Sequence, residues 1–387
     1  MFDDLPKWLE KLQKTSTSSS LEKAIHGDRL TPVEIARLIE ETPFYALSAA
    51  ADFMARTKKR NRGSFTVNIY LTYTNVCTTS CSFCAFYSPP DSPNAYVIQP
   101  RKLAEVAKKA EENGVMEIHM VGGNNPDLPF DYYEKLISSI KERTKKVTLK
   151  AFTAEEIWFI AKNTGQKTRE VLERFKELGL DSLSGGGAEV LDEEVQKIIA
   201  PKKVPPEEYL RVHEEAHKIG IKSNVTLMYG HIEEPINVAR HLYRVRSIEN
   251  RSPGFISFIP VRFNPGNTPL GRSDLYKRKA KVGGKYDLRI IASSRLALLG
   301  AIDNIVTYWV AMGEKLAQAA LTHGANDLGG TFYQEAVISA TGSFKVGKRP
   351  DELAFMIAQA GWEPWLRDTF YNYIDRINPI RMPWMNV

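Results

Sequence analysis

Cysteine is scarce in this chain, since only three occur in 387 residues, at positions 77, 81 and 84. Three is an odd number, and two thiols separated by two residues form a strained or redox-active bridge rather than a structural disulfide. No uninterrupted apolar run reaches the length needed to cross a bilayer, and residues 1–4 lack the basic-then-apolar order of a secretion signal. We therefore expect no membrane association and a location in the reducing cytoplasm.

Charge of one sign is not gathered into a long block. The net charge is +6, from 52 Lys and Arg against 46 Asp and Glu, and the basic residues are mixed with Glu along the chain. The short basic runs at 58–62 and 277–281 are typical of solvated loops rather than of a nucleic-acid interface. We expect no nucleic-acid binding, whereas a mildly positive surface suits a small anionic substrate. The apolar content of 43% is that of an ordinary soluble protein.

The three cysteines form the spacing C-x3-C-x2-C at Cys77, Cys81 and Cys84. A [4Fe–4S] cluster held by these thiolates has one iron without a cysteine ligand. S-adenosylmethionine can chelate that iron through its amino and carboxylate groups, and an electron from the cluster then yields a 5′-deoxyadenosyl radical. The motif therefore predicts a cluster and S-adenosylmethionine as cofactors.

Other uses of the cysteines remain as alternatives. A structural zinc site needs four ligands, so that a distant residue such as His119 would have to supply the fourth. Free buried cysteines can also serve as small hydrophobic residues, but the presence of all three in one cluster-ligand spacing favours the iron–sulfur interpretation.

Strand-like and helix-like periodicities alternate along the chain. Predicted strands occupy 66–72, 116–122, 146–153, 180–183, 221–229, 254–263 and 303–310, and predicted helices occupy 101–114, 130–144, 168–179, 205–220, 236–250 and 313–324. This alternation predicts an α/β fold with a parallel sheet and right-handed crossovers. Because the number of units approaches eight, closure into a TIM-type (β/α) barrel is favoured over an open sheet.

The predicted barrel covers residues 63–375. Residues 1–62 form a helical extension packed on it, with a capped helix start at Thr31 and a loop at 15–20, and residues 376–387 form a C-terminal tail. The cysteines directly follow the first predicted strand. They should therefore lie at the barrel mouth, where catalytic groups gather in such folds.

Several motifs in a fixed order resemble one protein family. They are the cysteine motif with Phe83 and the following Ala-Phe-Tyr, then 119–123 (HMVGG), 185–189 (GGGAE), 229–233 (YGHIE), 324–330 (GANDLGG) and 367–369 (RDT). Between about residues 21 and 371 the chain resembles the radical S-adenosylmethionine superfamily, in the branch of the menaquinone-pathway enzymes. That branch contains aminofutalosine synthase and dehypoxanthine futalosine cyclase, with the deazaflavin-precursor synthase as a cousin.

Within the branch, the segments 127–133 and 150–157 are most similar to aminofutalosine synthase. The resemblance implies addition of the adenosyl radical to 3-[(1-carboxyvinyl)oxy]benzoate, aryl migration and loss of bicarbonate to give aminofutalosine. It also implies a small anionic aromatic substrate and a low-potential electron donor of the flavodoxin or ferredoxin type. The sequence departs from the family at 124–126, at Ser184 and at 261–265, which leaves the cyclase and the deazaflavin-precursor synthase as alternatives. A non-catalytic metal-binding or electron-carrier protein is the alternative from another class.

Residues at predicted strand ends are the candidates for cofactor binding and catalysis. Phe83, Gly122, Gly123 and Glu189 are expected to contact the cofactor, the glycines because they let a backbone come close. His119, Glu189, Tyr229 and His231 are the catalytic candidates, with the last two expected to line the cavity. A satisfied core histidine at 119 and a helix-terminal acid at 189 are the structural alternatives.

Six further residues are candidates for substrate binding. Arg262 and Lys150 could pair with carboxylates, Arg through its two-pronged geometry, and an exposed strand position is the alternative for Lys150. Asn326 and Asp327 are expected in a glycine-flanked loop that closes over the ligand, with a plain turn as the alternative. Thr153 and Asn264 complete the set.

Overall fold

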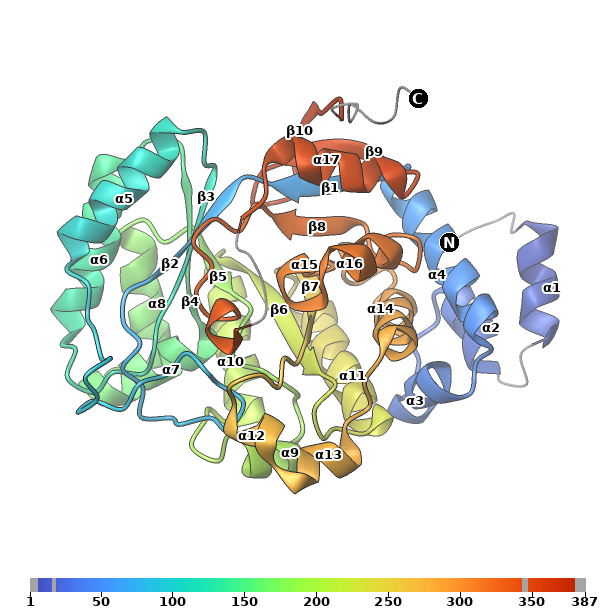
Figure 1. Ribbon diagram of the computed structural model, residues 1–387, viewed down its shortest axis with the longest axis horizontal. Coiled ribbons are helices and arrows are strands. Elements are labelled where there is room, and N and C mark those ends of the chain that lie inside the picture. The colour runs from blue at the N-terminus through green and yellow to red at the C-terminus, as the bar shows by residue number, and fades with distance from the viewer. Residues whose placement is uncertain (1–5, 16–18, 343–346, 380–387) are drawn as a thin grey trace.

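The structure is a computed structural model that describes residues 6–15, 19–342 and 347–379. Parallel strands in its centre are surrounded by helices (Figure 1). The larger sheet has the order β2-β3-β4-β5-β6-β7, and all of its pairings are parallel. Its strands are β2 (Asn68–Thr72), β3 (Glu117–Val121), β4 (Thr148–Thr153), β5 (Ser182–Ser184), β6 (Lys222–Tyr229) and β7 (Phe255–Arg262).

A smaller sheet of order β10-β9-β1-β8 completes the wall. It consists of β1 (Arg62–Thr66), β8 (Asp327–Gly330), β9 (Glu363–Arg367) and β10 (Tyr373–Arg376). Isolated bridges join the two sheets: Phe258 pairs with Ile305, Val306 with Asp327, and Ile69 with Tyr333. The strands therefore close into a TIM-type barrel, as the sequence predicts.

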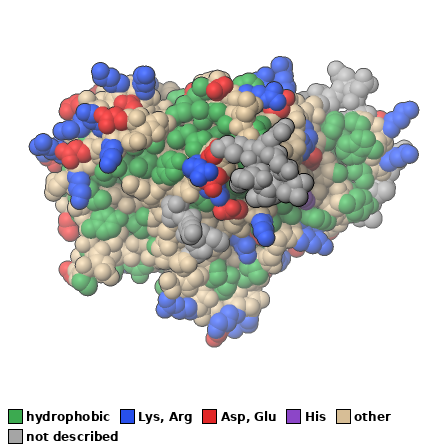
Figure 2. Space-filling view, turned by 45° about the horizontal axis from the view of Figure 1, so that its top comes forward, with side chains coloured by type: hydrophobic (Ala, Val, Ile, Leu, Met, Phe, Trp, Pro, Cys, Tyr) green, Lys and Arg blue, Asp and Glu red, His purple; other side chains and the backbone are tan. Residues whose placement is uncertain are grey.

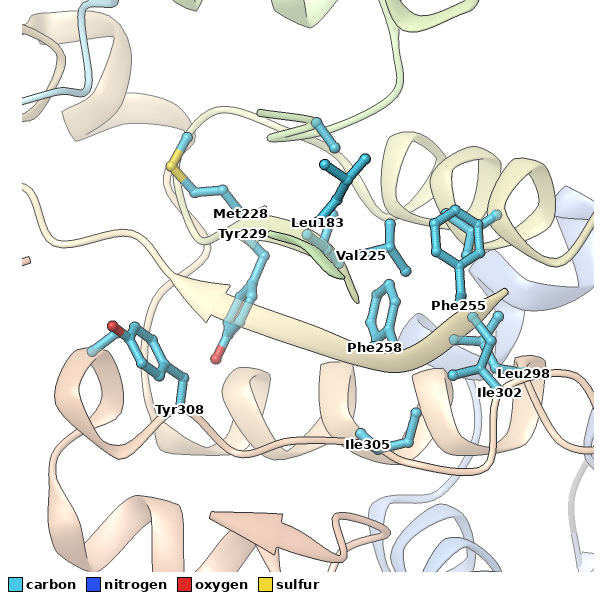
Figure 3. Packing of buried hydrophobic residues seen from close by; sticks show 14 of the residues in the cluster. Leu183, Val225, Met228, Tyr229, Phe255, Phe258, Leu298, Ile302, Ile305 and Tyr308 are labelled. Atoms are coloured by element: carbon cyan, nitrogen blue, oxygen red, sulfur yellow. The ribbon is translucent and has the colours of Figure 1, made fainter. Parts of the chain in front are cut away.

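Helices cover the outside of the barrel between consecutive strands. They are α5 (Pro100–Glu112), α6 (Phe130–Arg143), α7 (Ala154–Thr164), α8 (Thr168–Glu177), α9 (Glu193–Ile199), α10 (Pro206–Lys218), α11 (Pro235–Arg251) and α14 (Gly284–Ala297). Apolar side chains between strands and helices form the core; Figure 3 shows Val225, Phe258 and Leu298 among them. No helix within the described ranges is long and apolar enough to cross a membrane.

Among the described residues before the first strand there are four helices: α1 (Lys7–Thr15), α2 (Ser19–His26), α3 (Pro32–Glu40) and α4 (Phe44–Lys59). The predicted cap at Thr31 is confirmed, because its hydroxyl accepts from the Glu34 N–H and the Glu34 carboxylate accepts from the Thr31 N–H. Helix α3 packs on α11 and α4 packs on α14. Of the predicted loop at 15–20, residues 16–18 lie outside the described ranges.

The second half of the chain differs most from the prediction. In the predicted strand 303–310, only Ile305 and Val306 make bridges, and the helix α15 (Trp309–Met312) takes up its end. The expected loop around Asp327 is the strand β8. In the first half of the chain, a helix, α7, follows Thr153 directly. The remaining elements are α12 (Pro269–Arg272), α13 (Asp274–Lys279), α16 (Glu314–Ala320), η1 (Ser339–Thr341) and α17 (Pro350–Gln359). The basic run at 277–281 thus begins on a short helix rather than in a plain loop.

Candidate active site

A cavity of about 320 Å³ opens at the carboxyl ends of the barrel strands. Alternate residues of each strand face it, because successive side chains of a strand point to opposite sides. These inward residues include Asn68 and Tyr70 of β2, Glu117, His119 and Val121 of β3, and Asn224, Thr226 and Met228 of β6. The cavity is therefore the interior of the barrel mouth.

The three cysteines line this cavity together. Their loop is held from two sides through Ser82, whose N–H donates to the Ile199 carbonyl at 2.8 Å and whose carbonyl accepts from the Leu270 N–H at 2.8 Å. The Cys84 N–H donates to the Cys81 carbonyl at 3.1 Å, which closes a tight turn between these two cysteines. All three cysteine residues therefore border the same cavity.

The donor set fits an iron–sulfur cluster. Burial raises the pKa of Cys81 to about 12 and raises that of Cys84, so that without a cation these thiols keep their protons. Metal coordination replaces such protons and removes the cost of a buried thiolate. Cys77, Cys81 and Cys84 would hold the cluster, and the remaining described lining residues add no fourth cysteine.

Gly122 and Gly123 sit directly behind the cysteine loop. A Cβ on Gly123 would lie 2.2 Å from the Val76 carbonyl oxygen, and one on Gly122 would lie 2.4 Å from the Tyr73 ring. Both glycines also line the cavity. The structure therefore gives them a clear packing role, namely the close approach of β3 to the cysteine loop, and their contact with the cofactor stays a prediction.

Lys203 is a buried cation beside the cysteine loop that the sequence analysis did not single out. Its ammonium group lies 2.5 Å from Glu189 Oε1 and 5.1 Å from the centre of the Phe83 ring. The backbone of Glu189 is left-handed, with φ +48°, and this residue lines the cavity. Phe83 and Glu189 therefore lie in the cavity wall as expected, but Glu189 already has a cationic partner within the chain.

Two adjacent acids at the start of α7 join the strand ends to the cysteine loop. Glu155 accepts from Asn124 Nδ2 at 2.6 Å and from the Val204 N–H at 2.7 Å. Glu156 accepts from the Tyr73 hydroxyl at 2.7 Å and from the N–H groups of Gly122 and Thr153. Burial raises the pKa of Glu156 to about 7, against the opposing effect of these hydrogen bonds.

Thr153 is the N-cap of α7 and accepts from the Glu156 N–H at 3.1 Å. It lines the cavity, as expected for a substrate-binding candidate, although its hydroxyl is engaged in the cap. The pattern Thr-x-x-Glu is a capping box. This signal was present in the sequence and could have revealed both α7 and the buried Glu156.

His119 lies in the cavity wall between Tyr70 and Ser184. Its ring stacks on Tyr70 at 4.2 Å and its Nε2 is 2.7 Å from Ser184 Oγ. Burial and the nearby Lys150 charge lower the pKa of His119 to about 3, so the imidazole is neutral at physiological pH. It can offer a hydrogen bond to a ligand without adding charge.

Lys150 forms an ion pair with Glu117 at 2.7 Å, and both side chains are buried. Burial lowers the pKa of Lys150 despite the attraction of Glu117. Burial alone would raise the pKa of Glu117, but the positive charges of Lys150 and Arg367 outweigh it and hold this pKa at about 2. Glu117 is therefore ionised and the pair is charged, since each charge offsets the cost of burying the other. Lys150 is therefore not the exposed strand residue considered as its alternative.

Arg262 ends β7 and Asn264 lies two residues beyond it, and both line the cavity. Arg262 Nη1 is 3.8 Å from Asp287 Oδ2, and Asn264 Nδ2 donates to the Ala311 carbonyl at 3.3 Å. Arg262 is half-buried, and its carboxylate partner is more distant than those of Lys150 and Lys203. It is the cation of the wall that is best placed to receive an anionic group.

Four predicted site residues do not lie in the cavity wall. Tyr229 and His231 are fully buried, and His231 Nδ1 is 3.3 Å from Glu233 Oε2. Because Met228 faces the cavity, the next residue of the strand faces the opposite side. The expectation that Tyr229 and His231 line the cavity is therefore wrong, and Figure 3 shows Tyr229 packed within the apolar core. Their catalytic role stays untested.

Asn326 and Asp327 are also fully buried and belong to the barrel framework. Asn326 Oδ1 accepts from Arg295 Nη2 at 2.6 Å, and Asp327 receives two hydrogen bonds from Arg367, at 2.6 and 2.8 Å. The expected ligand-covering loop at these positions is wrong, since Asp327 begins β8. Arg367, the partner of Asp327, does line the cavity.

Comparisons with known proteins show the family of this chain. Residues 71–244 match the radical SAM superfamily, and residues 252–380 match the CofH/MqnC C-terminal region. The chain belongs to the radical SAM superfamily, in the group that carries this C-terminal region. It is accordingly a radical SAM enzyme, which uses a [4Fe–4S] cluster and S-adenosylmethionine and needs a reductant.

Two similar curated proteins carry the same name. The chain is 35% identical over 367 residues to the 5-amino-6-(D-ribitylamino)uracil–L-tyrosine 4-hydroxyphenyl transferase of Methanothermobacter thermautotrophicus, covering 94% of this chain and 99% of that protein. It is 36% identical over 312 residues to the transferase of the same name from Methanopyrus kandleri, covering 80% and 83%. These relatives agree with the deazaflavin-precursor alternative rather than with aminofutalosine synthase.

Solved structures support the fold. HydG, a maturase of the [FeFe]-hydrogenase, matches with a TM-score of 0.71 at 18% identity, over 92% of this chain and 78% of that chain. Methylornithine synthase (PylB) matches with a TM-score of 0.69 at 17% identity, over 89% and 97%. At these identities the likeness concerns the fold alone.

Proposed function

We propose that this enzyme transfers the 4-hydroxyphenyl-bearing part of L-tyrosine to 5-amino-6-(D-ribitylamino)uracil. The observation that carries the proposal is the likeness to transferases of this name over 94% of the chain, which includes the cysteine-lined barrel mouth. The same proposal replaces the aminofutalosine-forming reaction favoured by the sequence motifs.

The charges of the cavity support this choice of substrate. Three of its cations are committed to carboxylates: Lys150 to Glu117 at 2.7 Å, Lys203 to Glu189 at 2.5 Å, and Arg367 to Asp327 at 2.6 Å. The wall also contains Glu155, Glu156 and Glu335. A benzoate with a second carboxylate would need cations in excess, whereas an amino acid zwitterion and an uncharged uracil do not.

The polar groups of the wall suit an amide-rich ligand. Asn224 donates through Nδ2 to Ser257, but its Oδ1 is buried and has no hydrogen-bond partner among the described residues. A buried amide oxygen of this kind favours a ligand N–H donor. We assign Asn224, with the neighbouring Thr226, to the uracil, and the aromatic surface of Tyr70 and His119 to the phenol ring.

The bound cofactor supplies a 5′-deoxyadenosyl radical, formed by reductive cleavage of S-adenosylmethionine. Cys77, Cys81 and Cys84 would hold the cluster, and both substrates would bind in the barrel mouth. His119 stays neutral and so orients the phenol without exchanging a proton. In this proposal Arg262 receives the tyrosine carboxylate.

The test is product analysis with anaerobically reconstituted enzyme. The enzyme is incubated with reductant, S-adenosylmethionine, ring-labelled L-tyrosine and 5-amino-6-(D-ribitylamino)uracil, and Cys84→Ala serves as the inactive control. We expect one product that carries both the labelled ring and the ribityl-uracil, together with free 5′-deoxyadenosine. An adenosyl adduct of 3-[(1-carboxyvinyl)oxy]benzoate, with no labelled conjugate, would contradict the proposal.

A further inference from the structure

One short surface stretch of the chain is strongly basic. Residues 272–285, hereafter the basic segment, contain six cations and one acid, hence a net charge of +5, against +6 for all 387 residues. The cations are Arg272, Lys277, Arg278, Lys279, Lys281 and Lys285, and the acid is Asp274. The remaining residues together carry a net charge of +1 (+6 minus +5), although residues 56–62 form a second basic stretch.

Most of these cations are free for an external partner. Arg272, Arg278, Lys279 and Lys285 are exposed and form no ion pair with the described residues, whereas Lys277 pairs with Asp274 and Lys281 with Glu234 and Glu40. Lys and Arg side chains gather at the lower edge of the space-filling view (Figure 2), the side on which α9, α12 and α13 lie in Figure 1. A surface with unneutralised charge of one sign steers a partner of the opposite sign.

The basic segment lies next to the cysteine loop. Leu270, two residues before it, donates its N–H to the Ser82 carbonyl at 2.8 Å, and Ser82 lies between Cys81 and Cys84. On the other side, the Ser82 N–H donates to the carbonyl of Ile199 at the end of α9. Two hydrogen bonds thus connect the surface elements α9 and α12 to the residue between two cluster ligands.

Exposed apolar side chains accompany these charges. Val282 is 56% exposed within the basic segment, and Ile198 on α9 is 55% exposed next to the residue that contacts Ser82. Apolar contact surface with a charged rim is the usual composition of a protein interface. This combination favours a protein partner over a small ion or a uniformly charged polymer.

We propose that the basic segment, with the exposed end of α9, is the docking surface for an acidic one-electron carrier protein. The carrier passes one electron to the cluster and is itself oxidised by one electron, with no bond formed or broken in that step. The cluster then holds the electron that the cleavage of S-adenosylmethionine consumes. This inference rests on the radical SAM class and not on the identity of the organic substrates.

The experiment uses the reconstituted enzyme with flavodoxin, an acidic flavin-carrying electron donor, as the probe. The patch variant is Arg272→Glu/Arg278→Glu/Lys279→Glu. Its matched control is Lys102→Glu/Lys108→Glu/Lys109→Glu, which makes the same charge change at exposed positions of α5, far from α13 in Figure 1. Calorimetry measures the dissociation constant of the complex, and absorbance follows the oxidation of photoreduced flavodoxin.

We expect the patch variant to weaken flavodoxin binding and slow electron delivery at least about tenfold at low ionic strength. The difference should shrink at about 0.5 M salt, because exposed charges are then screened within a few ångströms. The control variant should behave like the unmodified enzyme. Dithionite-driven formation of 5′-deoxyadenosine should be equal in all three proteins.

Two results would overturn the inference. Equal flavodoxin affinity and equal electron delivery in the patch variant and the control would exclude docking at this surface. Loss of polyanion binding, measured with heparin, without any change in electron delivery would assign the surface to another kind of partner. Because dithionite and product analysis do not involve the carrier, failure of this inference is separable from failure of the proposed substrate assignment.

Discussion

Replacement of Arg367 by methionine should strongly destabilise the barrel. Arg367 donates to both oxygens of Asp327, at 2.6 and 2.8 Å, and the side chains are only 5% and 0% exposed. Removing the cation leaves a buried carboxylate without its counter-charge, which costs about 3–5 kcal/mol. This loss is a large share of the roughly 5–15 kcal/mol that holds a typical protein folded.

The assay is urea denaturation of the anaerobically prepared protein, followed by circular dichroism. The control is Arg169→Met, which breaks the pair with Glu173 at 2.8 Å where the side chains are 59% and 46% exposed. Such an exposed pair contributes only about 0–1 kcal/mol. If Arg367→Met lowered the free energy of unfolding no more than the control, the framework role of Asp327 would be refuted. If Asp327→Asn had the stability of the unmodified enzyme but a raised KM for a substrate, the predicted role of Asp327 in substrate binding would be restored instead.

Three further predictions concern the cavity wall. Gly123→Ala should hold less than half of the iron of the unmodified enzyme after reconstitution, because the added Cβ would lie 2.2 Å from the Val76 carbonyl oxygen. Iron analysis measures this, and full iron loading would contradict the close packing. Lys203→Met should lower the free energy of unfolding by about 3 kcal/mol, because it leaves Glu189 without its ion-pair partner. Adding Glu189→Gln should recover part of this stability. If denaturation experiments showed no recovery, the ion pair would not be the source of the loss. The pKa of Glu117 is about 2 in the folded protein, below its ordinary value of 4.5, so its stabilisation is complete above about pH 5 and is lost as the pH falls toward 2. We expect this acid-dependent loss to be on the order of 3 kcal/mol, and a Glu117→Gln variant with the same pH dependence between pH 5 and 2.5 would disprove it.

The sequence predicts the strand–helix alternation well where each element carries its own periodic signal. The strand predicted at 116–122 is observed as Glu117–Val121, and the helix predicted at 130–144 as Phe130–Arg143. Strand β8, with the sequence Asp-Leu-Gly-Gly, has no such signal. It is a strand because it pairs with β1, which lies more than 250 residues earlier in the chain, and a local pattern does not contain that contact.

In the site, too, residues with a local sequence signal are predicted and residues placed by long-range contacts are not. The cysteine ligands lie within eight residues, so that their spacing alone defines them. Lys203 approaches Glu189 and the cysteine loop through an irregular segment after α9, which no periodicity describes. Tyr229 and His231 were misplaced because proximity to a strand end does not determine which face a side chain occupies. The inward series Asn224, Thr226 and Met228 determines it instead.

The long-range closure between β1 and β8 also constrains how the protein is made. Strand β1 emerges from the ribosome early, but its partners β8 and β9 are synthesised only after residue 326. Until then the nascent chain carries an unpaired strand edge, a site at which misassociation occurs. The supports of the cysteine loop, Ile199 and Leu270, are also translated long after the cysteines themselves. The contacts that support the cysteine loop can therefore be complete only after most of the barrel has been translated.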